Sequence, residues 1–349
     1  MMQERKIRQL WEKLDKMVDA KICIIGGSGY IGSSLAKYLS SSFKVKIIDM
    51  KKPSELGIFD YAFCDIRERE AIEKEIRDVD LVIHAAIVQI PLINEQKRMG
   101  YEVNFLGTRN VCDAVDRNPN IKGLILTSSW HTIGEKGLEG VVDEEFGFRP
   151  DKVEERARLY ALSKIAQECT VRFYDEMSEK IFAVIRMGTV LGEGMPEKTA
   201  ANIFIDNALN GKPITPFSHS MHRPMFYVDL DDIVKAYDAF IRKILSDELE
   251  STGNNSLEHI VNVYNPEPIT IYELAEIVRD TVINQSSGSI IPQIQVINTG
   301  QDMIYEKNKK TRLAANMQKA LKLLNLKVFK HPRESIEQLV KNRISKRAN

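Results

Sequence analysis

The segment Lys21–Gly32, which reads KICIIGGSGYIG, constrains the fold of this chain more than any other stretch. The apolar run Ile22–Ile25 is typical of a strand that is buried on both faces of a parallel sheet. Spaced glycines follow it, and then Ile31, Leu35 and Leu39 recur at the spacing of a helix. Strand, glycine turn and helix in this order indicate a dinucleotide-binding turn, because the turn needs positive φ and the backbone must lie against a pyrophosphate.

The glycines of this turn fit the dinucleotide pattern in two registers. One register starts at Gly26 and the other at Gly27, and both share the two later glycines. The residues expected to hold the cofactor here are Gly26, Gly29, Tyr30, Ile31 and Gly32. The N–H groups at the start of the helix would face the phosphates. A tight turn in another kind of α/β protein is the alternative if the glycines are taken alone.

A second predicted strand, Lys44–Asp49, ends in an acidic residue. Asp49 lies about 20 residues beyond the glycine turn, where such folds place the acid that holds the adenosine ribose hydroxyls. Its negative charge would repel a 2′-phosphate, so NAD is favoured over NADP. The alternative is that Asp49 caps the turn at the end of its strand.

Further runs predict the rest of a doubly wound, Rossmann-type parallel α/β sheet. They are Tyr61–Ile66, Val79–Ile83, Gly123–Ser129, Ile181–Arg186 and His259–Tyr264. After the second of them, the small residues Ala85 and Ala86 let the backbone lie against a flat cofactor, although small residues also pack there for ordinary reasons. Asn104 lies inside a predicted helix, where asparagine costs stability, which indicates a local role. Thr127 and Ser129 end their strand at the edge where ligands bind in such sheets.

Tyr160 and Lys164 form the sharpest chemical pair in the sequence. They lie on one face of a predicted helix, one turn apart. A tyrosine is a poor base at neutral pH, and a lysine ammonium beside it should lower the pKa of the phenol. With Ser129 binding the same substrate oxygen, Tyr160 would take a proton from a hydroxyl as hydride leaves the same carbon for the nicotinamide. A chance pair on an exposed helix is the alternative when the spacing is taken alone.

From Lys21 to about Lys341 the chain resembles the extended short-chain dehydrogenase/reductases of the nucleotide-sugar epimerase/dehydratase type. The matching positions beyond the glycine turn are Asp49, Asp65, Ile66, His84, Ala85, Ala86, Asn104, Gly107, Thr108, Thr127, Ser128, Ser129, Tyr160 and Lys164. The resemblance implies that NAD is the cofactor and that a second, smaller α/β lobe binds substrate. It also implies a homodimer.

The resemblance assigns roles to several of these residues. Asp65 and Ile66 would flank the adenine, and Asn104 and Thr127 would belong to the cofactor site. The implied catalytic triad is Ser129, Tyr160 and Lys164. Arg223 matches a position at which the family grips a nucleotide diphosphate.

Departures from the family pattern bear on the reaction. Dehydratases of the family carry Asp-Glu directly after the serine, whereas this chain carries Trp130 and His131, so dehydration is disfavoured. Nucleotide-sugar enzymes often have Asn where this chain has Thr189. Both differences resemble the uronate dehydrogenase branch, which oxidises a free sugar acid. The expected substrate-binding residues are Ser129, His131, Thr189 and Arg223. Arg223 favours a diphosphate, unless it is an ordinary ion-pair residue.

The preferred hypothesis is an NAD-dependent epimerase of a nucleoside-diphosphate sugar, in which tightly bound NAD takes hydride and returns it to the opposite face. The first alternative is a net sugar or uronate dehydrogenase that releases NADH. A protein that binds NAD for regulation without catalysis is an alternative from another class, although the Tyr160–Lys164 pair argues against it.

Charge and cysteine content limit the partners. Lys and Arg total 49 and Asp and Glu total 49, so the formal net charge is zero, and neither nucleic acid nor a membrane surface is an expected partner. The four cysteines lie far apart, which predicts reduced, buried thiols in a cytoplasmic enzyme. His219 and His222 have a metal-like spacing but no third ligand, so no metal is expected.

The expected organisation has three parts. Residues 1–20 form an amphipathic N-terminal helix, and residues 21–189, with a returning segment at 225–265, form the NAD-binding domain. Residues 190–224 and 266–349 form the substrate-binding lobe, in which Ile290–Ile297 is a predicted strand.

Overall fold

The computed structural model describes residues 19–54, 59–251, 253, 255–307 and 309–348. The predicted helix of residues 1–20 falls almost entirely outside them. The chain divides into two compact units. The first comprises the chain up to Thr132, Glu155–Arg186 and Val234–Val261, and the second comprises Ile133–Glu154, Met187–Ile233 and the chain from Asn262. The second unit therefore includes residues 133–154, which the predicted boundaries assign to the NAD-binding domain.

A seven-stranded sheet forms the centre of the first unit, in the order β3-β2-β1-β4-β5-β7-β11. Its strands are β1 (Lys21–Ile25), β2 (Lys44–Asp49), β3 (Asp60–Phe63), β4 (Leu81–His84), β5 (Gly123–Ser129), β7 (Ile181–Met187) and β11 (Ile260–Val263). The neighbours from β3 to β5 pair in parallel. Because β1 lies between β2 and β4, the strand order reverses beside β1, and ligands bind at such a reversal. The predicted doubly wound sheet is confirmed.

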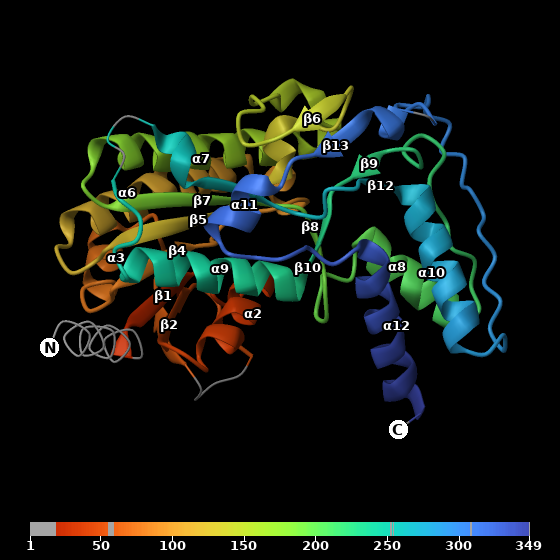
Figure 1. Cartoon of the computed structure of the whole chain (residues 1–349), viewed down its shortest axis with the longest axis horizontal. Helices are drawn as coiled ribbons and strands as arrows, with labels where there is room; N and C mark the ends of the chain where they lie inside the picture. The colour runs from red at the N-terminus through yellow and green to blue at the C-terminus, as the bar shows by residue number, and fades with distance from the viewer. Residues whose placement is uncertain (1–18, 55–58, 252, 254, 308, 349) are drawn as a thin grey trace, which may run out of the picture. The chain divides into compact units, whose positions relative to one another are not determined.

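Helices cover both faces of this sheet. They are α2 (Tyr30–Leu39), α3 (Arg69–Glu75), α4 (Leu92–Glu95), α5 (Lys97–Tyr101), the π-helix η1 (Glu102–Gly107), α6 (Thr108–Arg117), α7 (Arg158–Met177), α9 (Leu230–Leu245) and the short η2 (Trp130–Ile133), η4 (Glu155–Ala157) and η5 (Ser256–His259). Figure 1 shows α6 and α7 on one side of the strands and α2 and α9 on the other. Ile72, Val111 and Val171 bring α3, α6 and α7 into one buried apolar cluster with the sheet. That burial is the main force holding the layers together.

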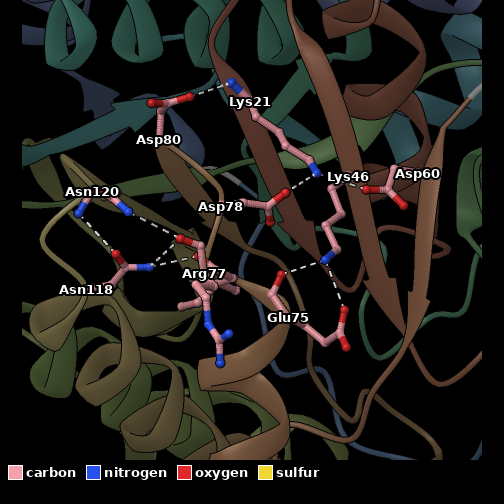
Figure 2. Close-up of polar contacts among 10 residues, drawn as sticks. Lys21, Lys46, Asp60, Glu75, Arg77, Asp78, Asp80, Asn118 and Asn120 are labelled. Atoms are coloured by element: carbon pink, nitrogen blue, oxygen red, sulfur yellow. Dashed lines mark hydrogen bonds and ion pairs between the residues drawn. The ribbon is translucent and has the colours of Figure 1, made fainter.

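Ion pairs hold the amino-terminal ends of the strands, as Figure 2 shows. The Lys21 ammonium lies 2.8 Å from Asp78 and 3.0 Å from Asp60, so it joins the start of β1 to β3 and to the loop before β4. The ammonium of Lys46, on β2, donates to the carbonyl of Glu75 at 2.7 Å and lies 3.0 Å from its carboxylate. The charges at this edge therefore stabilise the fold, and the opposite edge of the sheet carries the glycine turn and the candidate catalytic residues.

The second unit contains short sheets and longer helices. Its elements are β6 (Gly140–Val142), η3 (Pro150–Lys152), β8 (Thr189–Leu191), α8 (Ala200–Leu209), β9 (Pro224–Met225), β10 (Tyr227–Asp229), β12 (Ile269–Thr270), α10 (Ile271–Gln285), η6 (Lys309–Arg312), β13 (Leu313–Ala315), α11 (Gln318–Leu323) and α12 (Pro332–Ala348). Three two-stranded sheets pair β8 with β10, β9 with β12, and β6 with β13. The predicted strand Ile290–Ile297 is wrong, because this extended segment makes only isolated bridges, at Ile294 and Ile297.

One cysteine prediction needs correction. Cys23, Cys64 and Cys112 are buried as expected, whereas Cys169 is exposed, because it lies on the outward side of α7. Among the helices that the structure describes, none has the length and apolar character needed to cross a membrane.

Candidate active site

The glycine turn between β1 and α2 adopts one of the two predicted registers. Gly26 has φ +82° and a Cβ there would lie 2.5 Å from the backbone nitrogen of Ala86, so this position needs glycine both for conformation and for space. Gly27 does not take the left-handed conformation, and Gly29, with φ −75°, leaves a Cβ at 3.4 Å from its nearest neighbour. A Cβ on Gly32 would overlap the Gly26 carbonyl. A Cβ on Gly27 would also be crowded, at 2.6 Å from the Ile47 side chain, so the left-handed conformation is what singles out Gly26 as the start of the register.

The start of α2 fits a bound pyrophosphate. Gly29 is the N-cap residue, no side chain caps the helix, and its first turn, which begins with Tyr30 and Ile31, contains no acidic residue. A helix N-terminus of this kind attracts phosphate oxygens. Asp49 accepts hydrogen bonds from the backbone nitrogens of Ser28 at 3.0 Å and Lys51 at 2.9 Å. Its carboxylate thus caps the turn, as the alternative expected, and is also fixed beside it, where an adenosine ribose would lie.

Asn104 has a positioning role. Its side chain is 0% exposed, accepts from the backbone nitrogen of Val88 at 2.7 Å, and donates to the Val88 carbonyl and to Ser163. These contacts hold the loop after β4 beside the glycine turn, and the assignment of Asn104 to the cofactor site stays a prediction. Asn104 lies in the π-helix η1, so the irregular turn aims its amide at the loop that follows β4.

Other predicted cofactor residues already have protein partners. The carboxylate of Asp65 accepts from the Arg67 side chain, with Nε 2.9 Å from one oxygen, and this hydrogen bond is the main cause that lowers the pKa of Asp65. Ile66 is buried, and a Cβ on Gly107 would lie 2.6 Å from its side chain. The Thr127 hydroxyl hydrogen-bonds Tyr237 of α9 at 2.7 Å. The Thr127 hydroxyl is thus taken up by α9, and it is the Thr127 carbonyl that contacts α7, through Lys164.

Lys164, Tyr160 and Ser129 come together at the carboxyl end of β5. The Lys164 ammonium donates to the Thr127 carbonyl at 2.6 Å, and Tyr160 hydrogen-bonds Ser129. The Ser129 hydroxyl also lies 3.1 Å from Nδ1 of His131, and the His131 ring meets the Tyr160 ring edge-on at 5.7 Å between centroids. The helix that carries Tyr160 is thereby fixed to the strand that carries the hydroxyl.

The same helix is joined to the glycine turn. Gln167 donates to the carbonyl of Ala86 at 3.3 Å, and the backbone of Ala85 and Ala86 packs against Gly26. The predicted catalytic side chains and the predicted cofactor turn therefore share one rigid frame within the first unit.

Burial sets the protonation of the two central groups. It raises the pKa of Tyr160, and the hydrogen bond with Ser129 acts in the opposite direction. Burial lowers the pKa of Lys164 to about 7. In the chain alone, the expected lowering of the Tyr160 pKa by Lys164 is thus not seen, because burial raises this pKa and the contribution that opposes it comes from Ser129.

Arg223 is part of a buried ion-pair cluster in the second unit. Only 9% of the residue is exposed, its guanidinium lies 2.7 Å from Glu154 and 3.7 Å from Glu135, and the Tyr305 hydroxyl donates to Glu135 at 3.2 Å. The structure therefore places Arg223 as an ion-pair residue, which the sequence left open as the alternative. Its Nε is buried without a hydrogen-bond partner among the described residues.

Thr189 lies on β8 of the second unit, where its backbone nitrogen donates to the Phe226 carbonyl at 2.7 Å. Sequence reasoning missed Glu135 and Glu154 as partners of Arg223. The only signal for them was the acidic character of the loop after β5, and acidic loops are commonly solvated. It also missed the pair of Glu168 and Arg186, although Glu168 follows Lys164 by one helical turn.

The fold and the glycine turn define a Rossmann-type protein that binds a dinucleotide. Residues 22–252 match the model of the NAD dependent epimerase/dehydratase family, so the chain belongs to that family of oxidoreductases and isomerases, and its cofactor is NAD.

Individual relatives are distant. A Methanocaldococcus jannaschii protein assigned as UDP-glucose 4-epimerase is 27% identical over 75% of this chain and 82% of its own length. The D-erythronate dehydrogenase of Haemophilus influenzae is 23% identical over 69% of this chain and 85% of its own. The structure of Thermus thermophilus UDP-glucose 4-epimerase with NAD has a TM-score of 0.69 at 21% identity, over 92% of this chain and 98% of that one. These relatives differ in reaction, so the comparisons give the family and leave the reaction to the residues.

Proposed function

We propose that this chain is an NAD-dependent epimerase of a nucleoside-diphosphate sugar and that Ser129, Tyr160 and Lys164 carry its chemistry. The observation that supports the proposal most is the hydrogen-bonded arrangement of these three residues at the carboxyl end of β5, where Tyr160 meets Ser129 and Lys164 is fixed to the strand. That the M. jannaschii relative is assigned as a UDP-glucose 4-epimerase agrees with it.

Each residue has a distinct task in this proposal. Ser129 donates a hydrogen bond to the sugar hydroxyl that reacts and holds it near the phenol. Tyr160, as the phenolate, accepts the proton of that hydroxyl. It later returns a proton to the same oxygen, when hydride adds to the opposite face of the carbon. Lys164 supplies positive charge beneath the phenolate. Bound NAD supplies the hydride acceptor and donor, and the turn at Gly26 with Asp49 would hold it.

The position after Ser129 argues against dehydration in this proposal. Trp130 is fully buried, and His131 contacts Ser129 and the Tyr160 ring. Neither side chain is a carboxylate that can act as the acid and base of an elimination. The reaction therefore ends at oxidation and reduction of one carbon.

A second candidate is a net dehydrogenase of a free sugar or sugar acid, and the charge balance at Arg223 favours it. The single positive charge of Arg223 lies within ion-pair distance of two carboxylates, those of Glu135 and Glu154. A cation that is already neutralised gives little attraction to a diphosphate. The relative from H. influenzae is itself named as a dehydrogenase.

A single experiment separates these candidates. The protein is incubated with NAD and, in turn, with UDP-glucose, UDP-glucuronate, free glucuronate and free galacturonate, and both sugar epimers and NADH are measured. The epimerase proposal expects a new epimer without accumulation of NADH. Steady accumulation of NADH establishes the dehydrogenase. A protein that binds NAD and converts none of these compounds, in wild type as in Tyr160→Phe, would contradict both.

A further inference from the structure

A buried glutamate lies directly behind the proposed catalytic groups and has no part in the mechanism described so far. Glu168 on α7 is 0% exposed, and its carboxylate accepts from the Ser128 hydroxyl at 3.0 Å. Arg186 of β7, itself 2% exposed, donates to both of its oxygens, with Nη2 at 2.6 Å and Nε at 3.0 and 3.1 Å. A buried ion pair of this kind is costly to desolvate and adds little stability over apolar side chains, so stability alone is a weak reason for its presence.

The contacts of Glu168 link the two elements that carry the candidate chemistry. Ser128, its hydrogen-bond partner, directly precedes Ser129 on β5. Lys164 precedes Glu168 by four residues on α7, which places the two side chains on one face, one turn apart. The Lys164 ammonium in turn donates to the carbonyl of Thr127, the residue before Ser128. Glu168 and Lys164 therefore join α7 to the end of β5 at two adjacent residues, Ser128 and Thr127.

Among the groups around Lys164, the charge of Glu168 stabilises the protonated form of Lys164. Lys164 is 2% exposed, and burial opposes its charge. From β4, His84 faces it as a neutral ring, because burial, with a smaller contribution from the charge of Lys164, lowers the pKa of His84 to about 3. From β5 there is the Thr127 carbonyl, from β7 the cation of Arg186, and from α7 Tyr160 and Glu168. Of these groups, Glu168 is the one whose charge raises the pKa of Lys164.

We propose that Glu168 is a positioning residue of the active site, which favours the protonated form of Lys164 inside the protein and fixes Ser128 so that Ser129 faces Tyr160. The catalytic meaning of this inference rests on the proposed function, since a charged Lys164 matters only if Tyr160 acts as the base. The electrostatic part stands on the burial of Lys164 and Glu168 one turn apart on α7 and can be tested without any substrate. Arg186 then serves to hold the glutamate as a carboxylate in its buried place.

The test measures the titration of Lys164 through protein stability. The free energy of unfolding is measured in urea from pH 5 to pH 10 for each protein and for the same protein carrying Lys164→Met. The difference between the two values at each pH is the contribution of Lys164 to stability. Because the pKa of Lys164 is lower in the folded than in the unfolded chain, its burial cost is fully present below the folded pKa and fades as pH rises through it. The pH at which the difference begins to fade reports the folded pKa of Lys164.

The comparison is made in three backgrounds, which are wild type, a double variant at Glu168 and Arg186, and a control variant at Asp175. Glu168→Gln alone leaves Arg186 buried without a counter-ion and can unfold the chain, so Glu168→Gln with Arg186→Met removes both charges together. In this double variant, the onset, which is the pH at which the Lys164 contribution begins to fade, should fall by roughly half a unit to one unit. Coulomb's law gives a shift of this size for the loss of a carboxylate one helical turn from Lys164 together with its more distant partner, the Arg186 cation. Asp175→Asn is the control, because Asp175 is equally buried on α7 but pairs with His259. It should leave the onset unchanged.

An unchanged onset in the Glu168 and Arg186 double variant would overturn the inference, as would an equal displacement in Asp175→Asn. Turnover of the substrate identified with wild-type protein completes the test. The double variant should lose about three- to ninefold in kcat at pH 8, the change in the protonated fraction of Lys164 that a shift of half a unit to one unit gives, and regain part of it at pH 6, with KM nearly unchanged. If wild-type protein turns over no sugar while the onset still moves, the proposed function fails and the electrostatic role of Glu168 stands.

Discussion

Two alanine substitutions in the glycine turn should have opposite consequences for stability and for NAD binding. Gly26→Ala should destabilise the fold, because Gly26 has φ +82° and its added Cβ would lie 2.5 Å from the Ala86 nitrogen and 2.8 Å from the Ala85 carbonyl carbon. Gly29→Ala should leave the fold nearly intact, because Gly29 has φ −75° and ψ 171° and its Cβ would meet only the Gly26 carbonyl oxygen, at 3.4 Å.

The magnitudes follow from these contacts. A left-handed conformation costs an alanine about 1–2 kcal/mol, and the forced shift of a packed backbone costs about 1–3 kcal/mol more. Gly26→Ala should therefore lower the free energy of unfolding by about 2–5 kcal/mol. Alanine is a poorer N-cap than glycine, so Gly29→Ala should lower it by no more than about 1 kcal/mol. The methyl group of Gly29→Ala would lie where the backbone approaches a pyrophosphate, which should weaken NAD binding about tenfold or more.

Urea unfolding in the absence of NAD measures the stability of both variants, and isothermal titration calorimetry with NAD measures binding of those that fold. A Gly26→Ala variant as stable as wild type would show that the turn has been placed in the wrong register. A Gly29→Ala variant that binds NAD like wild type would show that the phosphates do not lie at the start of α2.

Three further predictions concern the charged and catalytic groups. Tyr160→Phe should lower kcat by about 10²–10⁴-fold with NAD affinity unchanged, and turnover equal to wild type would remove Tyr160 from the mechanism. Arg223→Met removes the cation that lies 2.7 Å from Glu154 in a buried ion pair and should cost about 3–5 kcal/mol in urea unfolding, whereas Arg242→Met, at a half-exposed ion pair on α9, should cost less than about 1 kcal/mol. Equal costs would mean that the Arg223 cluster is solvated. Stability should rise with pH from about 7 toward 10.5, by up to about 5 kcal/mol from Lys164, whose pKa burial lowers to about 7. Lys164→Met should abolish that rise and Lys37→Met, at an exposed position, should keep it.

The central sheet was predictable from local sequence, because strands buried on both faces must be continuously apolar. The apolar runs Ile22–Ile25 and Leu124–Leu126 lie in β1 and β5 for that reason. The short sheets of the second unit were not predictable, since β6 and β13 have three residues each and pair across almost half of the chain. The sequence predicts a strand at Ile290–Ile297, but this segment pairs at only two isolated bridges.

The candidate site was predictable in residue type and less so in electrostatics. The Gly26 turn, Asp49 and the Tyr160–Lys164 pair each carry a local pattern that function imposes on neighbouring residues. How far the charge of Arg223 is compensated depends on Glu135 and Glu154, which lie roughly 70 to 90 residues earlier in the chain and carry no pattern that links them to it. Likewise, the direction of the Tyr160 pKa depends on burial by surrounding elements, which spacing along one helix does not report.

The central claim is that Tyr160 takes a proton from a sugar hydroxyl while NAD held at the glycine turn takes the hydride. The most direct measurement is a single turnover in which NAD-loaded enzyme is mixed with each candidate sugar and NADH absorbance is followed in time. Wild type should show a transient or lasting NADH signal with one of the sugars, and Tyr160→Phe, which still binds NAD, should show that signal at least a hundredfold more slowly. An NADH signal of equal rate in both proteins would contradict the account.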